Sequence, residues 1–593
     1  MLGPFLKTVR DQSHLDLLPD VPESLLQAVP DELSSDHIRS LVTDARDGSD
    51  TTTVLSAVYT ALKSNKFTAR LNGHEEDSAI LSDLALHVGQ LMEPICSGAA
   101  YDEDSTDYAS LSRNGLLGLH ILRVLLALRR PEEGLVLPMR ALLSVIAYTN
   151  RDDPWTTDAN ADLARSLLSD YFQSITPPRA VQPPLSSCTR SLRDARTGRE
   201  PDEGGFKTER ARFVADDVLT GFLRPLFAKS RPTTVTASGR PAAFPDPRPR
   251  YAQGDGFGGE DDVAATKPWK YARRYAITVF QWAVENADTE LLKQHWPLYT
   301  PILLTLLDEP QPASLKLRSL SIFRDFWHRC PDGLLSRTGL ADVFQQAIFP
   351  TVLSLPSLTP EDESCALLSA AYPALFDIAG LEEAGGSRSV EDEVQNAGAA
   401  AEATNDRPVS GERDLHSNGF SDAQRKFLDK IVREGIMVGY HHAKEHVHLV
   451  NLFCKTLRRL VSGMGIISVK YLQDIISMIS EILVDPFGTK HPPTLLSAIQ
   501  LLQAVLRTCW PRIPHYCNEI IKMGVLAWLN IEEDDSFPTT RPTKAELKQQ
   551  LIRTIEILSA VAAAAKLDMS DRVQPLVTKD PQLRPLFTGC EAK

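Results

Sequence analysis

The sequence contains few cysteines, and they follow no regular spacing. Eight cysteines occur in 593 residues, and no two of them form a Cys-x-x-Cys pair. A disulfide framework would need a denser and more regular set. Scattered cysteines in a long chain are typical of reduced thiols in the cytosol or the nucleus. We therefore expect a protein of the cytoplasm and nucleus without a disulfide framework.

Long hydrophobic runs and an excess of positive charge are also absent. The most apolar stretch, residues 115–128, contains His120 and Arg123 and is shorter than a bilayer-spanning helix. The first 18 residues lack a basic region followed by an apolar core, so no signal peptide is expected. The chain has 63 Lys and Arg against 77 Asp and Glu, a net charge of −14. Because broad nucleic-acid binding needs a cationic surface, we expect neither a membrane nor a direct nucleic-acid partner.

Motifs of the common catalytic folds are missing. The sequence has no Walker-type loop, no Gly-x-Ser-x-Gly elbow and no set of kinase motifs. The glycine-rich residues 254–259 lie in a proline-rich segment, without the strand and helix that a phosphate-binding loop needs. Asp308 and Asp485 each follow an apolar helix, where aspartate commonly caps a turn. Cys509 and Cys517 have no neighbouring base. We therefore expect no catalytic residues, no cofactor and no enzymatic activity.

Helical periodicity dominates the remaining pattern. Apolar residues recur at intervals of three and four, and Pro and Gly cluster between the periodic segments. Predicted helices in the first part of the chain cover 50–63, 77–92, 112–129 and 161–173. The composition divides the chain into an N-terminal helical region at 1–175, a Pro/Gly-rich linker at 176–266 with a helix at 207–229, helical repeats at 267–380, a disordered acidic insertion at 381–420 and C-terminal helical repeats at 421–593.

Two parts of the helical region share a pattern. Residues 301–326 and 479–506 each contain an apolar helix that ends at an aspartate, a proline-bearing turn and a leucine-rich helix. This pattern matches the unit of HEAT-type solenoids, which repeats about every 40–47 residues. Such units bury their apolar faces against neighbouring units. The sequence therefore predicts an all-α fold, a HEAT-like α-solenoid of stacked helical hairpins with disordered insertions. A non-repetitive helical bundle is the alternative.

The histidine-rich stretch after Tyr440 resembles a metal site. His442-Ala-Lys-Glu445-His446 fits the His-x-x-Glu-His pattern of one class of zinc hydrolase. On a continuous helix through residues 440–461, His442 and His446 would fall within a widened apolar face. A buried face is a poor place for an open catalytic metal, and no third ligand can be named. Packed or edge histidines are the favoured interpretation, and no metal is expected; a zinc hydrolase remains a remote alternative.

Residues 267–275 interleave basic and aromatic side chains. The sequence Lys-Pro-Trp-Lys-Tyr-Ala-Arg-Arg-Tyr combines the residue types that grip nucleic-acid backbones and stack bases. The segment runs directly into the apolar stretch AITVFQWAV. This continuation favours a helix start whose aromatic residues pack inward and whose cations are solvated, with a structural or partner-facing role.

The C-terminal half resembles a known family. The relevant stretches are residues 268–286, 295–323, 334–360 and 469–513, and the most specific parts are LLSRTGL at 334–340, LVDPFGTKHPP at 483–493 and CWPRI at 509–513. Together they are similar to the Tel-two-interacting protein two family in its fungal form, over about 268–565. The resemblance implies a helical, HEAT-like scaffold without an active site.

The same resemblance implies a set of partners. Proteins of this family form the Triple-T complex with Tel-two and Tel-two-interacting protein one. Together with the ninety-kilodalton heat-shock chaperone system, that complex supports the folding and assembly of phosphatidylinositol-three-kinase-related kinases, which act in DNA-damage, telomere and nutrient signalling. A HEAT-type cargo adaptor of the importin kind is the alternative function.

A set of contact residues can be predicted for such a scaffold. Recognition by solenoids depends on a few buried anchor residues at the interface, among which Trp and Arg are enriched. The loop and helix-end residues Asp485, Pro486, Phe487, Trp510 and Arg512 have this composition and are expected to lie near one another. The alternative is that Phe487 and Trp510 are core residues that close a repeat.

Overall fold

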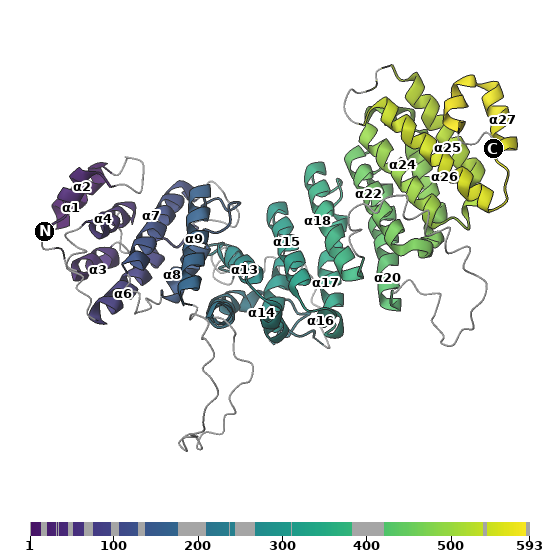
Figure 1. The fold of residues 1–593 in the computed structure, drawn as a ribbon. Helices are drawn as coiled ribbons and strands as arrows, with labels where there is room; N and C mark the ends of the chain where they lie inside the picture. Colours follow the sequence, from purple (N-terminus) through teal and green to yellow (C-terminus); the bar gives the residue numbers. More distant parts are fainter. Residues whose placement is uncertain are drawn as a thin grey trace, which may run out of the picture. The chain divides into compact units, whose positions relative to one another are not determined.

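Helices form nearly all of the regular structure (Figure 1). The computed structural model describes residues 2–12, 21–30, 33, 35–44, 51–64, 75–96, 106–128, 137–175, 209–236, 238–242, 267–309, 311–381, 420–535, 537 and 542–588. Within these residues, extended backbone pairs only at an isolated bridge between Val235 and Pro241. The predicted all-α fold is confirmed. Among the same residues, none of the helices is both long enough and apolar enough to cross a bilayer.

Packing divides the chain into two compact units. Unit 1 comprises Met1–Pro312 with Asp325–Leu340, and unit 2 comprises Ala313–Arg324 with Ala341–Lys593. The border falls within helix α15 (Ala313–Arg329), not at the changes in composition. The predicted insertion at 381–420 and most of the predicted linker, including the glycine-rich residues 254–259, lie outside the described residues.

The first part of unit 1 is a stack of helices in two rows. One row contains α1 (Leu2–Gln12), α4 (Thr51–Lys63), α7 (Tyr108–Ala127) and α9 (Asp158–Ile175). The other contains α3 (Ser35–Asp44), α6 (Glu75–Leu91), α8 (Met139–Ile146) and α13 (Ala276–Glu285), while the short α2 (Glu23–Gln27) packs on α4. Each helix contacts the next member of its own row, so apolar faces are buried along the stack. The four helices predicted here are all present, with ends within a few residues of the predicted ones.

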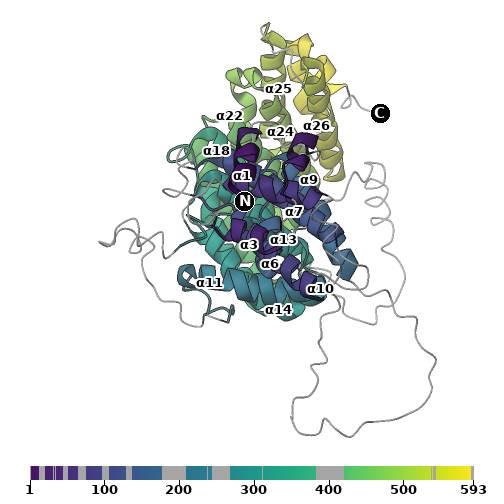
Figure 2. The same ribbon diagram turned by 90° about the vertical axis from the view of Figure 1, so that its left-hand side faces the viewer.

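The helix predicted at 207–229 is present but irregular. It consists of α10 (Glu209–Arg212), the π-helix η2 (Phe213–Leu223), α11 (Arg224–Phe227) and the 3-10 turn η3 (Ala228–Ser230). Its apolar side packs on α13 and on α14 (Thr289–Asp308), and Figure 2 shows α11 beside α14. Unit 1 also contains the short α16 (Leu334–Arg337).

Residues 231–236 and 238–242, within the predicted linker, form a turn that packs on α14. Val235 is buried, and the Ala242 N–H donates to the Thr234 carbonyl at 2.8 Å. Gly239 has a φ of +75°, and a Cβ there would lie 1.9 Å from the Pro297 carbonyl oxygen of α14. Pro301 has no N–H to bond that carbonyl, which leaves room for the glycine backbone to approach. The turn is therefore fixed against α14.

Unit 2 repeats the two-row arrangement. One row contains α18 (Glu361–Ala379), α22 (Val447–Met464), α24 (Pro492–Thr508) and α26 (Lys544–Ala564), and the other contains α23 (Leu472–Val484), α25 (Ile513–Glu533) and η8 (Pro581–Phe587). The remaining elements are α17 (Leu340–Ile348), η4 (Phe349–Leu353), α20 (Asp422–Lys430), the π-helix η5 (Ile431–Met437), α21 (Val438–Ala443), η6 (Gly465–Tyr471), η7 (Pro486–Lys490) and α27 (Ser570–Lys579).

Hydrogen bonds join successive helices of one row in unit 2. Thr494 of α24 donates to the Val447 carbonyl of α22 at 3.0 Å, 47 positions away in the sequence. Gln503 of α24 donates to the Gln550 carbonyl of α26 at 3.1 Å, again 47 positions away. This separation lies within the HEAT-type period of about 40–47 residues. The stack is therefore solenoid-like, as predicted.

Polar caps fix several helix starts. Asp107 and Asp288 accept hydrogen bonds from backbone N–H groups in the first turns of α7 and α14. Ser421 and Thr543 form complete capping boxes at α20 and α26. Each cap satisfies N–H groups that have no partner within the helix.

Candidate protein-interaction sites

Asp485, Pro486 and Phe487 form the turn between α23 and α24. The Asp485 carboxylate accepts a hydrogen bond from the Phe487 N–H at 3.0 Å and caps η7. This capping role agrees with the turn chemistry predicted for Asp485. The Phe487 side chain is 78% exposed. The alternative that Phe487 is a core residue is therefore wrong.

Trp510 and Arg512 lie in the turn between α24 and α25. Trp510 is 57% exposed, and Arg512 is exposed as well. The 17 residues of α24 separate this turn from Phe487, a length of about 25 Å at 1.5 Å per residue. The predicted contact residues are thus all exposed, but the structure places them at opposite ends of α24.

Phe487 belongs to a row of exposed apolar side chains. Val447, at the first position of α22, is 42% exposed, and Leu358, in the turn before α18, is 89% exposed. All three lie beside the starts of neighbouring parallel helices, α18, α22 and α24. We call this row of Leu358, Val447 and Phe487 the Phe487 edge.

Polar contacts hold the helix starts of the Phe487 edge together. Nδ1 of His446 lies 2.9 Å from Oε2 of Glu361, which joins the start of α22 to the start of α18. The Thr494 hydroxyl donates to the Val447 carbonyl and joins α24 to α22. The apolar side chains therefore project from an ordered base, which reduces the entropy lost when a partner binds.

His491 lies at the same edge and is sensitive to pH. Its ring packs edge-on against that of His448, with 4.8 Å between ring centroids, and its Nδ1 lies 2.6 Å from the Thr494 hydroxyl. Burial, together with repulsion from His448, lowers the pKa of His491 below its ordinary value. The folded chain therefore binds this proton less readily than the unfolded chain does.

This difference predicts a loss of stability in acid. Because the unfolded chain takes up the proton first, the free energy of unfolding falls as the pH drops through about 6.5, the ordinary pKa of histidine. We expect the melting temperature to fall between about pH 7.5 and about pH 5.5, and His491→Asn, which places a favourable N-cap residue at the start of α24, to remove part of that fall. Circular dichroism measures both effects. His515→Asn, at an exposed position of α25, is the control, and an equal effect of the two substitutions would contradict the assignment.

The His442-Ala-Lys-Glu445-His446 pattern does not lie on one helix. α21 ends at Ala443, a two-residue turn follows, and His446 is the N-cap of α22. The continuous helix expected through 440–461 is therefore wrong, and so is the apolar placement of His442, which is exposed. Residues four apart share a face only within one helix. In the described part of the chain, no group of three or more His, Cys, Asp or Glu side chains is arranged to hold a metal ion.

The aromatic residues of the 267–275 segment are structural. Trp269 is fully buried and stacks on Phe227 with 5.0 Å between ring centroids. Its Nε1 donates to the Ser230 hydroxyl at 3.0 Å. Tyr275 is also buried and stacks on Phe222 at 5.7 Å. These rings connect the segment to η2, α11 and η3 and have no free face for stacking on bases.

The cations of the same segment are paired, not solvated as expected. Lys267 and Lys270 contact the same Glu309 carboxylate oxygen at 2.6 Å and 3.1 Å. Arg274 donates to the Tyr108 hydroxyl at 3.0 Å. The segment is therefore an internal clamp of unit 1.

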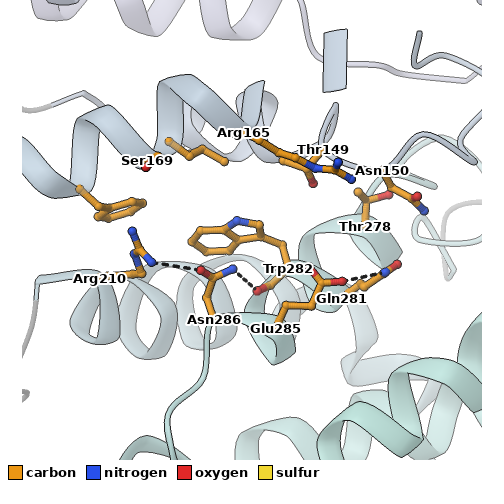
Figure 3. Close-up of a pocket in the computed structure, with 12 residues that line it drawn as sticks. Thr149, Asn150, Arg165, Ser169, Arg210, Thr278, Gln281, Trp282, Glu285 and Asn286 are labelled. Atoms are coloured by element: carbon orange, nitrogen blue, oxygen red, sulfur yellow. Dashed lines mark hydrogen bonds between the residues drawn. The ribbon is translucent and has the colours of Figure 1, made fainter. Parts of the chain in front are cut away.

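A cavity of about 270 Å³ lies between α9 and α13 in unit 1. Figure 3 shows Arg165 and Ser169 of α9 on one wall and Trp282 of α13 on the other. The Arg210 guanidinium donates to the Asn286 side chain at 3.4 Å, and Gln281 donates to Glu285 at 2.9 Å, so the wall opposite α9 is largely hydrogen-bonded within itself (Figure 3).

The lining of this cavity limits its chemistry. It includes no His or Cys, and its one carboxylate, that of Glu285, is held by Gln281. No pair of nucleophile and base is present in it. The cavity has room for a small polar group.

A comparison with family models identifies the family to which the chain belongs. The model described as the Tti2 family matches residues 141–490, more than half of the 593 residues. The chain belongs to the Tti2 family. Among curated proteins, none matches it.

The residues matched by the family model, 141–490, differ from the range of about 268–565 that the sequence resemblance indicated. The Tti2 family match begins within α8 and includes α9, well before residue 268, where the resemblance begins. It ends at residue 490, so it contains the whole Phe487 edge but neither Trp510 nor Arg512. The 270 Å³ cavity also lies entirely within it.

Two features of these sites were missed in the sequence. Leu358 lies in the segment PSLTP between Pro356 and Pro360, and an apolar residue between two prolines was a signal for an exposed turn. Arg165 and Trp282, which face each other across the cavity, carry no signal, because their meeting depends on how two distant helices pack.

Proposed function

We propose that this chain is a non-catalytic scaffold subunit of the Triple-T co-chaperone complex. In this role it binds Tel-two and Tel-two-interacting protein one in the cytoplasm and nucleus. Through them and the ninety-kilodalton heat-shock chaperone system, it supports the folding and stability of phosphatidylinositol-three-kinase-related kinases. Membership of the Tti2 family over residues 141–490 is the observation that carries this proposal. The two-row helical stacks support it, because HEAT-type stacks offer long surfaces to partner helices.

Within this proposal, the Phe487 edge is the main partner-binding surface of unit 2. Its three exposed apolar side chains lie beside the starts of neighbouring helices, and the family match includes all three of them. Exposed apolar groups on an ordered base are typical of interaction sites. Trp510 and Arg512 form the second candidate, at the opposite end of α24.

Affinity purification from the native cell tests the proposed function. We expect the tagged full-length chain to retain both other Triple-T subunits, identified by mass spectrometry, and a tagged unrelated helical protein to retain neither. A folded bait that retains neither subunit would contradict the proposal. The full chain is required because deletion of residues 1–266 would remove α9 and η2, which pack against the rest of unit 1.

A further inference from the structure

A second cavity in unit 1 has a different character. It encloses about 410 Å³ between α8, the η2–α11 region and residues 268–275. Leu143, Phe222 and Leu226 form its apolar floor and are buried, and Met139 lines one wall. Gly221 faces Met139, with 3.5 Å from an ideal Cβ to the Met139 terminal methyl group. The stack of Tyr275 on Phe222 makes the far wall rigid.

The charges around this cavity are unbalanced. Its single carboxylate, that of Glu93, accepts a hydrogen bond from the Tyr275 hydroxyl and lies 3.6 Å from Nε of Arg273. Arg140 and Lys229 also line the cavity, and both side chains are exposed. Neither makes an ion pair with another residue of the described part of the chain. Two exposed cations therefore line this cavity without an ion-pair partner among the described residues.

This local excess contrasts with the rest of the molecule. The chain as a whole carries a net charge of −14, so an excess of positive charge is a local feature of this cavity. A cavity with an apolar floor and two unpaired cations at its rim matches a ligand that carries one large apolar side chain between carboxylates. Arginine and lysine pair with carboxylates, and the floor buries the apolar group.

We propose that this cavity docks an acidic segment of a partner protein. A large apolar side chain of the segment fills the space above Leu143, Phe222 and Leu226. Its flanking carboxylates pair with Arg140 and Lys229. The site belongs to unit 1 and does not depend on the Phe487 edge or on the proposed function, since a chain that fails to enter the Triple-T complex would still bind such a segment.

A differential peptide selection tests this proposal. The probe is a phage-displayed library of random dodecapeptides, panned on the full-length chain and, in parallel, on the double variant Arg140→Glu with Lys229→Glu. Both positions are exposed and make no ion pair, so the variant is expected to fold normally, which circular dichroism verifies. We expect the wild-type chain to enrich peptides with several Asp or Glu around one Phe, Leu or Trp, and the variant not to enrich them.

Matched variants distinguish binding in this cavity from non-specific attraction of acidic peptides to surface cations. For a selected peptide with a fluorescent label, anisotropy is expected to show at least tenfold weaker binding to the double variant and to Gly221→Leu, which fills the cavity from its wall. Arg224→Glu removes an exposed cation of α11 outside the lining and is expected to change binding less than twofold. Equal enrichment by wild type and double variant, or equal losses with Arg224→Glu, would overturn the proposal. So would peptides that bind as well after their apolar residue is replaced by serine.

Discussion

Replacement of Trp269 by alanine is expected to destabilise unit 1 by about 3–5 kcal/mol. Trp269 is fully buried, stacks on Phe227 and donates a hydrogen bond to Ser230, so truncation removes a large packed ring and leaves a cavity. The loss should spread to the cation pairs on Glu309, because the same short segment carries both.

Hydrogen exchange measured by mass spectrometry resolves the effect by region. Since each 1.4 kcal/mol is about a factor of ten in an equilibrium constant, slow amides near residues 213–230 and 268–285 should exchange a hundredfold or more faster. Trp510→Ala makes the same chemical change at an exposed site and is expected to alter stability by less than about 0.5 kcal/mol. Trp269→Phe preserves most of the packing and should fall between the two. Equal effects of the two alanine substitutions would show that Trp269 is not the anchor of the clamp.

The fold was largely predictable because the evidence for helices is local. Apolar periodicity and proline-bearing turns located the helices around residues 51–63 and 495–508 without knowledge of their neighbours. The break between α21 and α22 was not predicted, because Ala443 to Val447 continues the apolar period even though the backbone turns there. Periodicity reports which residues are buried and does not report whether the helix axis is continuous.

The candidate sites were less predictable because they depend on tertiary packing. Phe487 and Trp510 are both exposed, but the length of α24 separates them, so they do not form one site as the sequence predicted. Leu358 and Val447 join Phe487 only because α18, α22 and α24 run in parallel within one row. The basic and aromatic residues of 267–275 show the converse case. Their composition is that of a binding surface, and the fold uses nearly all of them internally.

The double substitution of Phe487 and Leu358 by alanine is expected to weaken assembly with the Triple-T partners. Truncation of a central apolar anchor typically costs about 2 kcal/mol or more, which corresponds to about a thirtyfold rise in Kd. Stability should change little, because both side chains are largely exposed and the backbone at the edge is held by other residues. Quantitative co-purification of full-length chains at several partner concentrations measures the affinity, and circular dichroism verifies the fold.

The opposite end of α24 supplies the matched control. The double substitution Trp510→Ala with Ile466→Ala also removes two exposed apolar side chains from unit 2. The Ser468 hydroxyl lies 3.4 Å from the Cys509 thiol, so the segments that carry Ile466 and Trp510 lie at the same end of the row. If the Phe487 edge binds the partners, this second pair should change the affinity less than threefold. A loss with the second pair alone would move the interface to Trp510 and Arg512 while leaving the scaffold proposal intact. A loss with neither pair would exclude both ends of α24, and the partner contacts would then have to involve other surfaces of the chain.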